Sequence, residues 1–471
     1  MTSTEPRSKP GESSPSGAPG EPTLARRLGA FDATMIVMGG IIGAGIFVNP
    51  SVVARQVHTP GLVLGAWIIG GAIALMGAFV YAELAALRPR VGGQYAYLRD
   101  AYHPIVAFLY GWTLLLVVQT GGMAGAAIIF GRYLRELSGV GISEQAAAAL
   151  TLGVLTLVNC LGVRAGSNVQ SALMLTKLAA ILGLIGVGLF VAPQATSPAA
   201  PDAASTGGGG LAGLATAMVP VLFAYGGWQT SSFVSGEMKN PRRDLPRGLL
   251  IGVIGVIVLY LSVTYVCLRS LGVDGLAATS TPASEVMRRA LGDRGARLIA
   301  LGIAVSTVGF LSQSVLTAPR VYYAMARDGV FFKAVGTLNP KSRVPVVAIV
   351  LQGVWAAVIA LTGKYDQILN YVEAIDVLFF GLTGASLIIF RMRARKAGED
   401  EKRVRVPLHP FTTGVFVLAC WLISLTTVIR YPAHAGVGFG ILLVGVAVYF
   451  LWARHGSSPA RIPPEKGSDP I

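Results

Sequence analysis

Two glycine-containing segments within long apolar runs could bind a small charged molecule through their main chain. The first reads MIVMGGIIGAGIFVNP (35–50) and the second VPVLFAYGGWQTSSF (219–233). Glycine is about 1 kcal/mol less favourable in a helix than alanine, so GAG and GG predict an interruption in each helix. Small residues at this spacing could instead form only a helix-packing face. An interrupted helix exposes amides that bind a carboxylate and carbonyls that bind an ammonium, which suits the zwitterionic head group of an α-amino acid.

Three ionisable residues lie deep inside other apolar runs. Lys177 has apolar neighbours on both sides in MLTKLAAILGLIG. A lysine at the centre of a membrane span costs at least ~2.5 kcal/mol, so it needs a partner and usually has a role. Glu373 and Asp376 are three residues apart and would share one helical face. They could serve a proton relay or bind a cationic substrate. The alternative is that this part of the helix is exposed to water and the two residues are only solvated.

Charged residues near the ends of apolar runs are candidates for a gate. Glu83, Glu237 and Arg320 each lie near the end of a run, and Lys239 follows closely after Glu237. They could form ion pairs that open and close a pathway. The alternative is that each is a separately solvated helix end.

The elements that carry these residues must be membrane-spanning helices. The chain has 471 residues, of which 53% are hydrophobic and 13% charged, and its mean hydropathy is +0.63. A soluble domain has about 25% charged residues, so the composition excludes a soluble enzyme and a disordered chain. Because each span needs about 20 apolar residues, the sequence predicts an all-α polytopic membrane protein.

The apolar runs predict twelve spans, and the two glycine segments fall in the first and the sixth. The spans are placed at 31–56, 61–87, 104–133, 145–161, 166–192, 214–236, 247–270, 296–326, 345–362, 367–391, 411–430 and 435–453. Paired interruptions at corresponding positions of two halves are typical of a transporter's binding site. Lysine and arginine concentrate in both tails and in every second loop, which predicts that both termini are cytoplasmic.

Other features argue against further classes of function. The net charge of +15 does not indicate nucleic-acid binding, because the cations lie in short clusters between apolar runs and not along one face with aromatic residues. The cysteines and histidines have neither disulfide-framework nor metal-ligand spacing. Gly207–Gly210 is not followed by the Gly-Lys-Ser/Thr of a phosphate loop. We therefore expect no cofactor, no metal and no nucleic-acid partner, and nothing indicates a membrane-embedded enzyme.

Several motifs in order resemble one known family. GIIGAGIF in the first span, YAELAALRPRVGGQYAYLRDAY at 81–102, and FAYGGW followed by GEMKNP are similar to the amino acid–polyamine–organocation superfamily, closest to the L-type amino acid transporters and their bacterial homologues. The resemblance covers about 25–455. It implies a five-plus-five inverted repeat, as in sodium-coupled leucine transporters, followed by two further helices.

Composition, the charge distribution and that resemblance together predict a division of the chain into six parts. They are a disordered cytoplasmic tail (1–29), a first repeat (30–192), an external loop (193–213), a second repeat (214–392), two final spans (393–455) and a cytoplasmic tail (456–471).

The resemblance also assigns site residues at matching positions. Main-chain amides around Ala44 and Gly45 would hold the substrate carboxylate, although relatives often have serine in place of Ala44. Gly43 is also expected among the substrate-binding residues. Carbonyls near Ile41, Phe223 and Gly226 would bind the ammonium, and the Phe223 ring would also act as a gate. Tyr225 and Trp228 would shape the side-chain pocket or merely pack. Lys177 would stand where a sodium ion sits in sodium-coupled relatives, with Ser312 as a neighbour and Ser314 as a second candidate.

The function implied is a sodium-independent secondary transporter of amino acids in the cytoplasmic membrane. Glycines at the breaks and no obvious charged pocket residue favour a neutral L-amino acid, carried by exchange or with protons. The segment 132–145 contains no cysteine, so we expect no disulfide-linked heavy subunit beside the lipid bilayer. A cationic amino acid or polyamine permease, and an amino acid sensor that does not transport, remain alternatives.

Overall fold

The protein is all-helical over the part of the chain that its computed structural model describes. That part comprises residues 28–88, 92–139, 141–161, 166–195, 210–340, 344–397 and 404–455, with only the backbone described for 166–172, 211 and 453–455. Its β-structure there is limited to an isolated bridge between Leu28 and Met238. Helices are expected in hydrocarbon, because each satisfies its own backbone hydrogen bonds. The prediction of an all-α fold is therefore confirmed.

The helices follow the predicted apolar runs closely. They are α1 (Ala30–Ile41), α2 (Asn49–Val57), α3 (Pro60–Leu87), α4 (Gln94–Ala101), α5 (Pro104–Thr113), α6 (Gln119–Ser138), α7 (Glu144–Leu161), α8 (Gly166–Phe190), α9 (Leu211–Tyr225), α10 (Thr230–Phe233), α11 (Pro241–Ala278), α12 (Pro282–Thr317), α13 (Pro319–Arg327), α14 (Val346–Thr362), α15 (Tyr365–Ala397), α16 (Phe411–Arg430) and α17 (Pro432–His455). Proline begins several of them, as expected where no amide partner is needed.

Some helices depart from a single regular span. The π-helical turn η2 (Leu114–Val118) joins α5 to α6 without a break. The predicted span 296–326 extends further toward the N-terminus, because α12 begins at Pro282 and bends at Gly292, where the backbone is not helical. Both tails and 196–209, including the Gly207–Gly209 part of the glycine run, lie outside the described residues.

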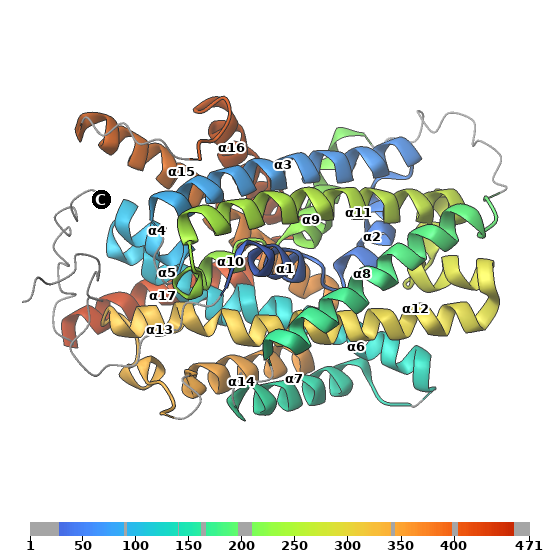
Figure 1. Ribbon diagram of the computed structural model, residues 1–471, viewed down its shortest axis with the longest axis horizontal. Coiled ribbons are helices and arrows are strands. Elements are labelled where there is room, and N and C mark those ends of the chain that lie inside the picture. Colours follow the sequence, from blue (N-terminus) through green and yellow to red (C-terminus); the bar gives the residue numbers. More distant parts are fainter. Residues whose placement is uncertain are drawn as a thin grey trace, which may run out of the picture.

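The long helices form one bundle around the short helix α1. Figure 1 shows α3, α11, α8 and α12 running roughly along the long axis of the molecule, with α1 near the middle. Helix α11 packs against α3 and α1, and α12 packs against α8 and α6. Over the described residues, nine helices are long and apolar enough to cross a membrane, and α1 and α14 are shorter apolar helices. The chain is therefore a multi-pass membrane protein.

The helices at the edge of the bundle present their apolar side chains outward. In α7, Leu150, Leu157 and Leu161 are 64%, 68% and 86% exposed. In helix α17, likewise, only 22% of the apolar stretch is buried inside the protein. Such faces are stable next to lipid chains, whereas the small and aromatic residues pack inside.

Both predicted helix interruptions are present, and they lie against each other. Helix α1 ends at Ile41, and the short turn η1 (Gly45–Phe47) then leads into α2. Helix α9 ends at Tyr225, and α10 begins at Thr230. A Cβ atom on Gly40 would lie 2.7 Å from the Gly227 carbonyl oxygen, and one on Gly227 would lie 2.1 Å from the Gly40 oxygen. Gly227 also has φ of +108°, so only glycine fits at this crossing.

Candidate functional site

A cavity lies between the two helix interruptions. It contains about 790 Å³ of empty space, part of which is continuous with solvent. Its lining comes from both interruptions and from η2, α6, α12 and α15. Six predicted residues line it, namely Ile41, Gly43, Ala44, Gly45, Phe223 and Gly226. The structure thus brings together residues that are about 180 positions apart in the sequence.

The first interruption presents free amides to this cavity. The Gly43 amide donates to the Ile41 carbonyl over 2.8 Å. The amides of Ala44 and Gly45 donate to no other group in the described part of the chain. Ala44 directly precedes the short turn η1, and Gly45 is its first residue. Unpaired amides at the start of such a turn can bind an anion. This main chain can bind a carboxylate without the hydroxyl that Ala44 lacks.

The carbonyls of the two interruptions differ in their availability. The Ile41 oxygen already accepts from the Gly43 amide and from the Tyr260 hydroxyl, which is 3.0 Å away. A carbonyl has two lone pairs, so Ile41 has little capacity left for an ammonium. The carbonyls of Phe223 and Gly226 accept from none of the described residues. Two of the three predicted carbonyls can therefore bind a substrate cation directly.

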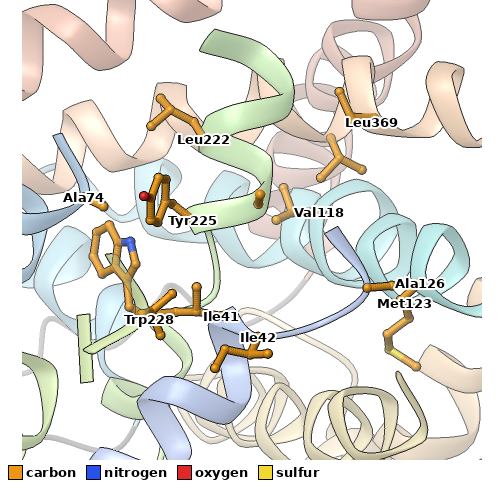
Figure 2. Packing of buried hydrophobic residues seen from close by; sticks show 14 of the residues in the cluster. Ile41, Ile42, Ala74, Val118, Met123, Ala126, Leu222, Tyr225, Trp228 and Leu369 are labelled. Carbon is orange, nitrogen blue, oxygen red and sulfur yellow. The ribbon is translucent and has the colours of Figure 1, made fainter. Parts of the chain in front are cut away.

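Tyr225 and Trp228 pack behind the second interruption and do not line the cavity. The Tyr225 hydroxyl donates to the Trp67 carbonyl over 3.2 Å. The Trp228 ring lies 4.6 Å from the Tyr81 ring and 4.9 Å from the Phe380 ring, centroid to centroid. Figure 2 shows both side chains on the side of Ala74, away from Val118 and Ala126 of the cavity wall. Of the two roles left open by the sequence, this geometry fits packing.

Two aromatic rings border the cavity. Phe223 is half-buried and meets the Tyr365 ring edge-on at a centroid distance of 6.3 Å. Phe310 on α12 lies directly over the first interruption, since a Cβ on Gly43 would be 3.3 Å from its ring. The sequence reasoning missed Phe310, because a lone aromatic residue in an apolar span carries no distinguishing signal.

Lys177 contacts the end of α1. Its side chain is 1% exposed, and its ammonium donates to the carbonyls of Ile42 and Gly39, the latter at 3.4 Å. These are carbonyls at the C-terminal end of a helix, where a cation is favoured. Ser312 does not line the cavity, whereas Ser314 does. The lysine therefore lies beside the first interruption, held by the carbonyls of Gly39 and Ile42.

The candidate gate residues form two separate ion pairs. Arg320 pairs with Glu237 at 3.1 Å. Glu83 instead receives two hydrogen bonds from Arg391, at 2.6 and 2.7 Å, and a third from the Val406 amide at 2.6 Å. The three predicted gate residues thus do not share one cluster, and Glu83 joins α3 to the end of α15.

Glu373 and Asp376 also line the cavity. They are 3% and 7% exposed and share one face of α15, as their spacing predicted. Neither carboxylate forms a hydrogen bond or ion pair with another described residue. Gln119 of α6 lines the same cavity. The premise that the pocket has no charged residue is therefore wrong.

This architecture defines a class of protein: a multi-pass helical membrane protein whose central cavity is bordered by two interrupted helices. The particular family follows from comparison with known proteins. A family model described as "Amino acid permease" matches residues 28–452, and the chain belongs to that family. Its members are amino acid transporters and not enzymes, so amino acid transport is the activity of this class.

Individual relatives cover almost the whole chain. The serine/threonine exchanger SteT of Bacillus subtilis is 30% identical over 436 residues, which cover 91% of this chain and 97% of that protein. The b(0,+)-type amino acid transporter 1 of Mus musculus is 27% identical over 470 residues, or 94% of each chain. The large neutral amino acids transporter small subunit 2 of Mus musculus is 30% identical over 457 residues, covering 93% and 83%.

Proposed function

We propose that the chain is a sodium-independent secondary transporter that moves amino acids across the cell membrane by alternating access. The observation that carries the proposal is the meeting of two interrupted helices at one cavity, with free amides on the first and free carbonyls on the second. Ala44 and Gly45 would bind the carboxylate, and Phe223 and Gly226 the ammonium. A zwitterion satisfies both sets at once, whereas each set left alone would be a buried unpaired group.

The topology of the proposal is the inverted-repeat arrangement of twelve spans. The first repeat would be 30–192 and the second 214–392, with 193–213 outside and both tails in the cytoplasm. In its support, each interruption lies in the first helix of its proposed repeat. In such folds one bundle rocks against the other around a fixed site.

Lys177 would replace the coupling sodium ion. Its ammonium is held by main-chain carbonyls at the end of α1, where a free cation would otherwise be needed. The charge is part of the chain, so a sodium gradient would supply no driving force. Exchange for an internal amino acid, or coupling to protons, would then drive uptake. SteT is named an exchanger, which favours exchange.

The charge of the substrate's side chain is a separate matter. A neutral substrate was expected because no charged pocket residue was evident in the sequence. Glu373 and Asp376 line the cavity, so that reason no longer holds. They favour the second candidate, a cationic amino acid permease.

The test is uptake of a radiolabelled amino acid mixture into proteoliposomes of the purified protein. We expect uptake that rises with internal amino acid or an inward proton gradient and is unchanged by a sodium gradient. The Lys177→Ala variant should show no uptake, although it should still elute as a monodisperse protein in size-exclusion chromatography. Sodium-dependent uptake would refute the role of Lys177, and absence of any accumulation or exchange would favour a sensor.

A further inference from the structure

We propose that Glu373 and Asp376 form a subsite for a positively charged substrate side chain. The transporter would then prefer cationic amino acids to neutral ones of the same shape. This inference rests on the proposed function, because the interrupted helices must first hold the head group of the amino acid.

The first support is the position of the two carboxylates. Both belong to α15 and lie one helical turn apart, so they occupy one face of one helix. Both line the cavity that the interruptions border, although α15 contributes neither amides nor carbonyls of an interruption. The wall that carries them is thus distinct from the main chain that would hold the head group.

The second support is that neither carboxylate has a partner within the described chain. An acidic residue inside a membrane protein is costly and is normally paired. Other acids of this protein follow that rule, since Glu83 pairs with Arg391 and Asp328 pairs with Arg99 at 2.6 Å. Glu373 and Asp376, more than nine-tenths buried, do not. The missing positive charge is therefore expected from whatever occupies the cavity.

The third support is the sign of the rest of the lining. No lysine, arginine or histidine is among the described residues that line the cavity. The nearby ammonium of Lys177 is already engaged by the carbonyls of Gly39 and Ile42 at the C-terminal end of α1. Gln119 adds an uncharged amide that can accept a hydrogen bond from a guanidinium or ammonium. This chemistry attracts a cation and does not attract an anionic side chain.

The same cavity argues against a polyamine. A polyamine has no carboxylate, so the amides of Ala44 and Gly45 would stay buried without an acceptor. An amino acid with a cationic side chain satisfies the amides, the carbonyls and the acidic pair together. Arginine, lysine and ornithine have this combination of groups.

The decisive comparison is between arginine and citrulline, which have the same length and nearly the same shape. Citrulline carries a neutral ureido group in place of the guanidinium. Competition against radiolabelled arginine should be measured in proteoliposomes of the full chain, with lysine and norleucine as a second matched pair and putrescine as a third competitor. A hydrogen bond to a charged group predicts that arginine competes about ten- to a hundred-fold better than citrulline, and that putrescine competes weakly.

Isosteric variants then assign the preference to the acidic pair. Glu373→Gln and Asp376→Asn should each reduce the arginine-to-citrulline ratio several-fold toward one while citrulline still competes. Asp366→Asn is the matched control, because Asp366 lies on the same helix but is exposed and outside the cavity. It should leave the ratio unchanged. Ligand-induced thermal stabilisation of purified protein by arginine and citrulline gives the same comparison without transport.

The outcomes separate this inference from the transport function. Equal competition by arginine and citrulline in the native protein would overturn the acidic subsite, as would a ratio unchanged in both variants. Uptake of neutral amino acids that is driven by protons and loses this dependence in Glu373→Gln or Asp376→Asn would also overturn it, in favour of a proton relay. If no amino acid is taken up, exchanged or bound, the proposed function fails together with the subsite.

Discussion

Replacement of Gly227 by alanine should separate the two interrupted helices. A Cβ at this position would lie 2.1 Å from the Gly40 carbonyl oxygen and 2.6 Å from its carbonyl carbon. Carbon atoms normally make contact at about 3.5–4.0 Å, so the interruptions must move apart by about 1 Å. The obstacle is main chain on both sides, and no rotamer change can relieve it.

The energetic cost has two parts. A residue with a Cβ at φ of +108° is strained by about 1–2 kcal/mol, and overpacking adds about 1–3 kcal/mol. The sum is about 2–5 kcal/mol, enough to lower thermal stability clearly. A shift of about 1 Å in a preorganised site costs on the order of a hundredfold in enzymes, so we expect at least a tenfold loss of uptake.

Gly226→Ala is the matched control for the stability part of this prediction. Gly226 has φ of −63° and ψ of 162°, which alanine adopts freely, and its Cβ would lie 3.4 Å from its nearest neighbours, the carbonyl oxygens of Leu222 and Phe223. The assay is thermal inactivation in detergent, followed by size-exclusion chromatography, together with uptake into proteoliposomes. A Gly227→Ala protein that melts and transports like the native one would refute the reasoning, and so would an equal loss of thermal stability in Gly226→Ala.

Three further predictions concern buried polar contacts. Lys177→Met keeps an unbranched side chain without the ammonium and leaves the carbonyls of Gly39 and Ile42 without this donor. We therefore expect loss of uptake and a cost of about 1–3 kcal/mol for each carbonyl; a variant with native uptake would contradict this. Asn49→Leu removes the amide that accepts from the Tyr365 hydroxyl at 2.9 Å, and it should lower the melting temperature more than Tyr365→Phe does. Glu83→Gln breaks the ion pair between the buried Glu83 and the partly exposed Arg391. Because solvent screens the exposed partner, we expect a cost of about 1–3 kcal/mol, and stability equal to the native protein would show that the pair is dispensable.

The helices and both interruptions could be predicted from local sequence. Apolar runs bounded by charges gave the helix positions to within a few residues for α3, α14 and α16. The GAG and GG sequences located the interruptions, because closely spaced glycines weaken a helix locally. The spacing of Glu373 and Asp376 likewise predicted their shared face.

Other features of the site could not be predicted, because they depend on which helices face one another. The sequence could not tell that the Tyr260 hydroxyl occupies the Ile41 carbonyl, that Trp228 packs against Phe380, or that Phe310 covers Gly43. Glu83 also pairs with Arg391, more than 300 residues away. The local composition around these residues does not indicate any of these contacts.

Composition, hydropathy and glycine placement are therefore sufficient to establish a multi-pass helical protein with two broken spans. The spans and their breaks are local features, because they depend on the cost of exposing backbone and charge to hydrocarbon over short stretches. Helix packing alone decides that the breaks touch at Gly40 and Gly227 and that the acids of α15 face the space beside them. That outcome depends on long-range contacts between surfaces, which are similar in composition and differ only in shape.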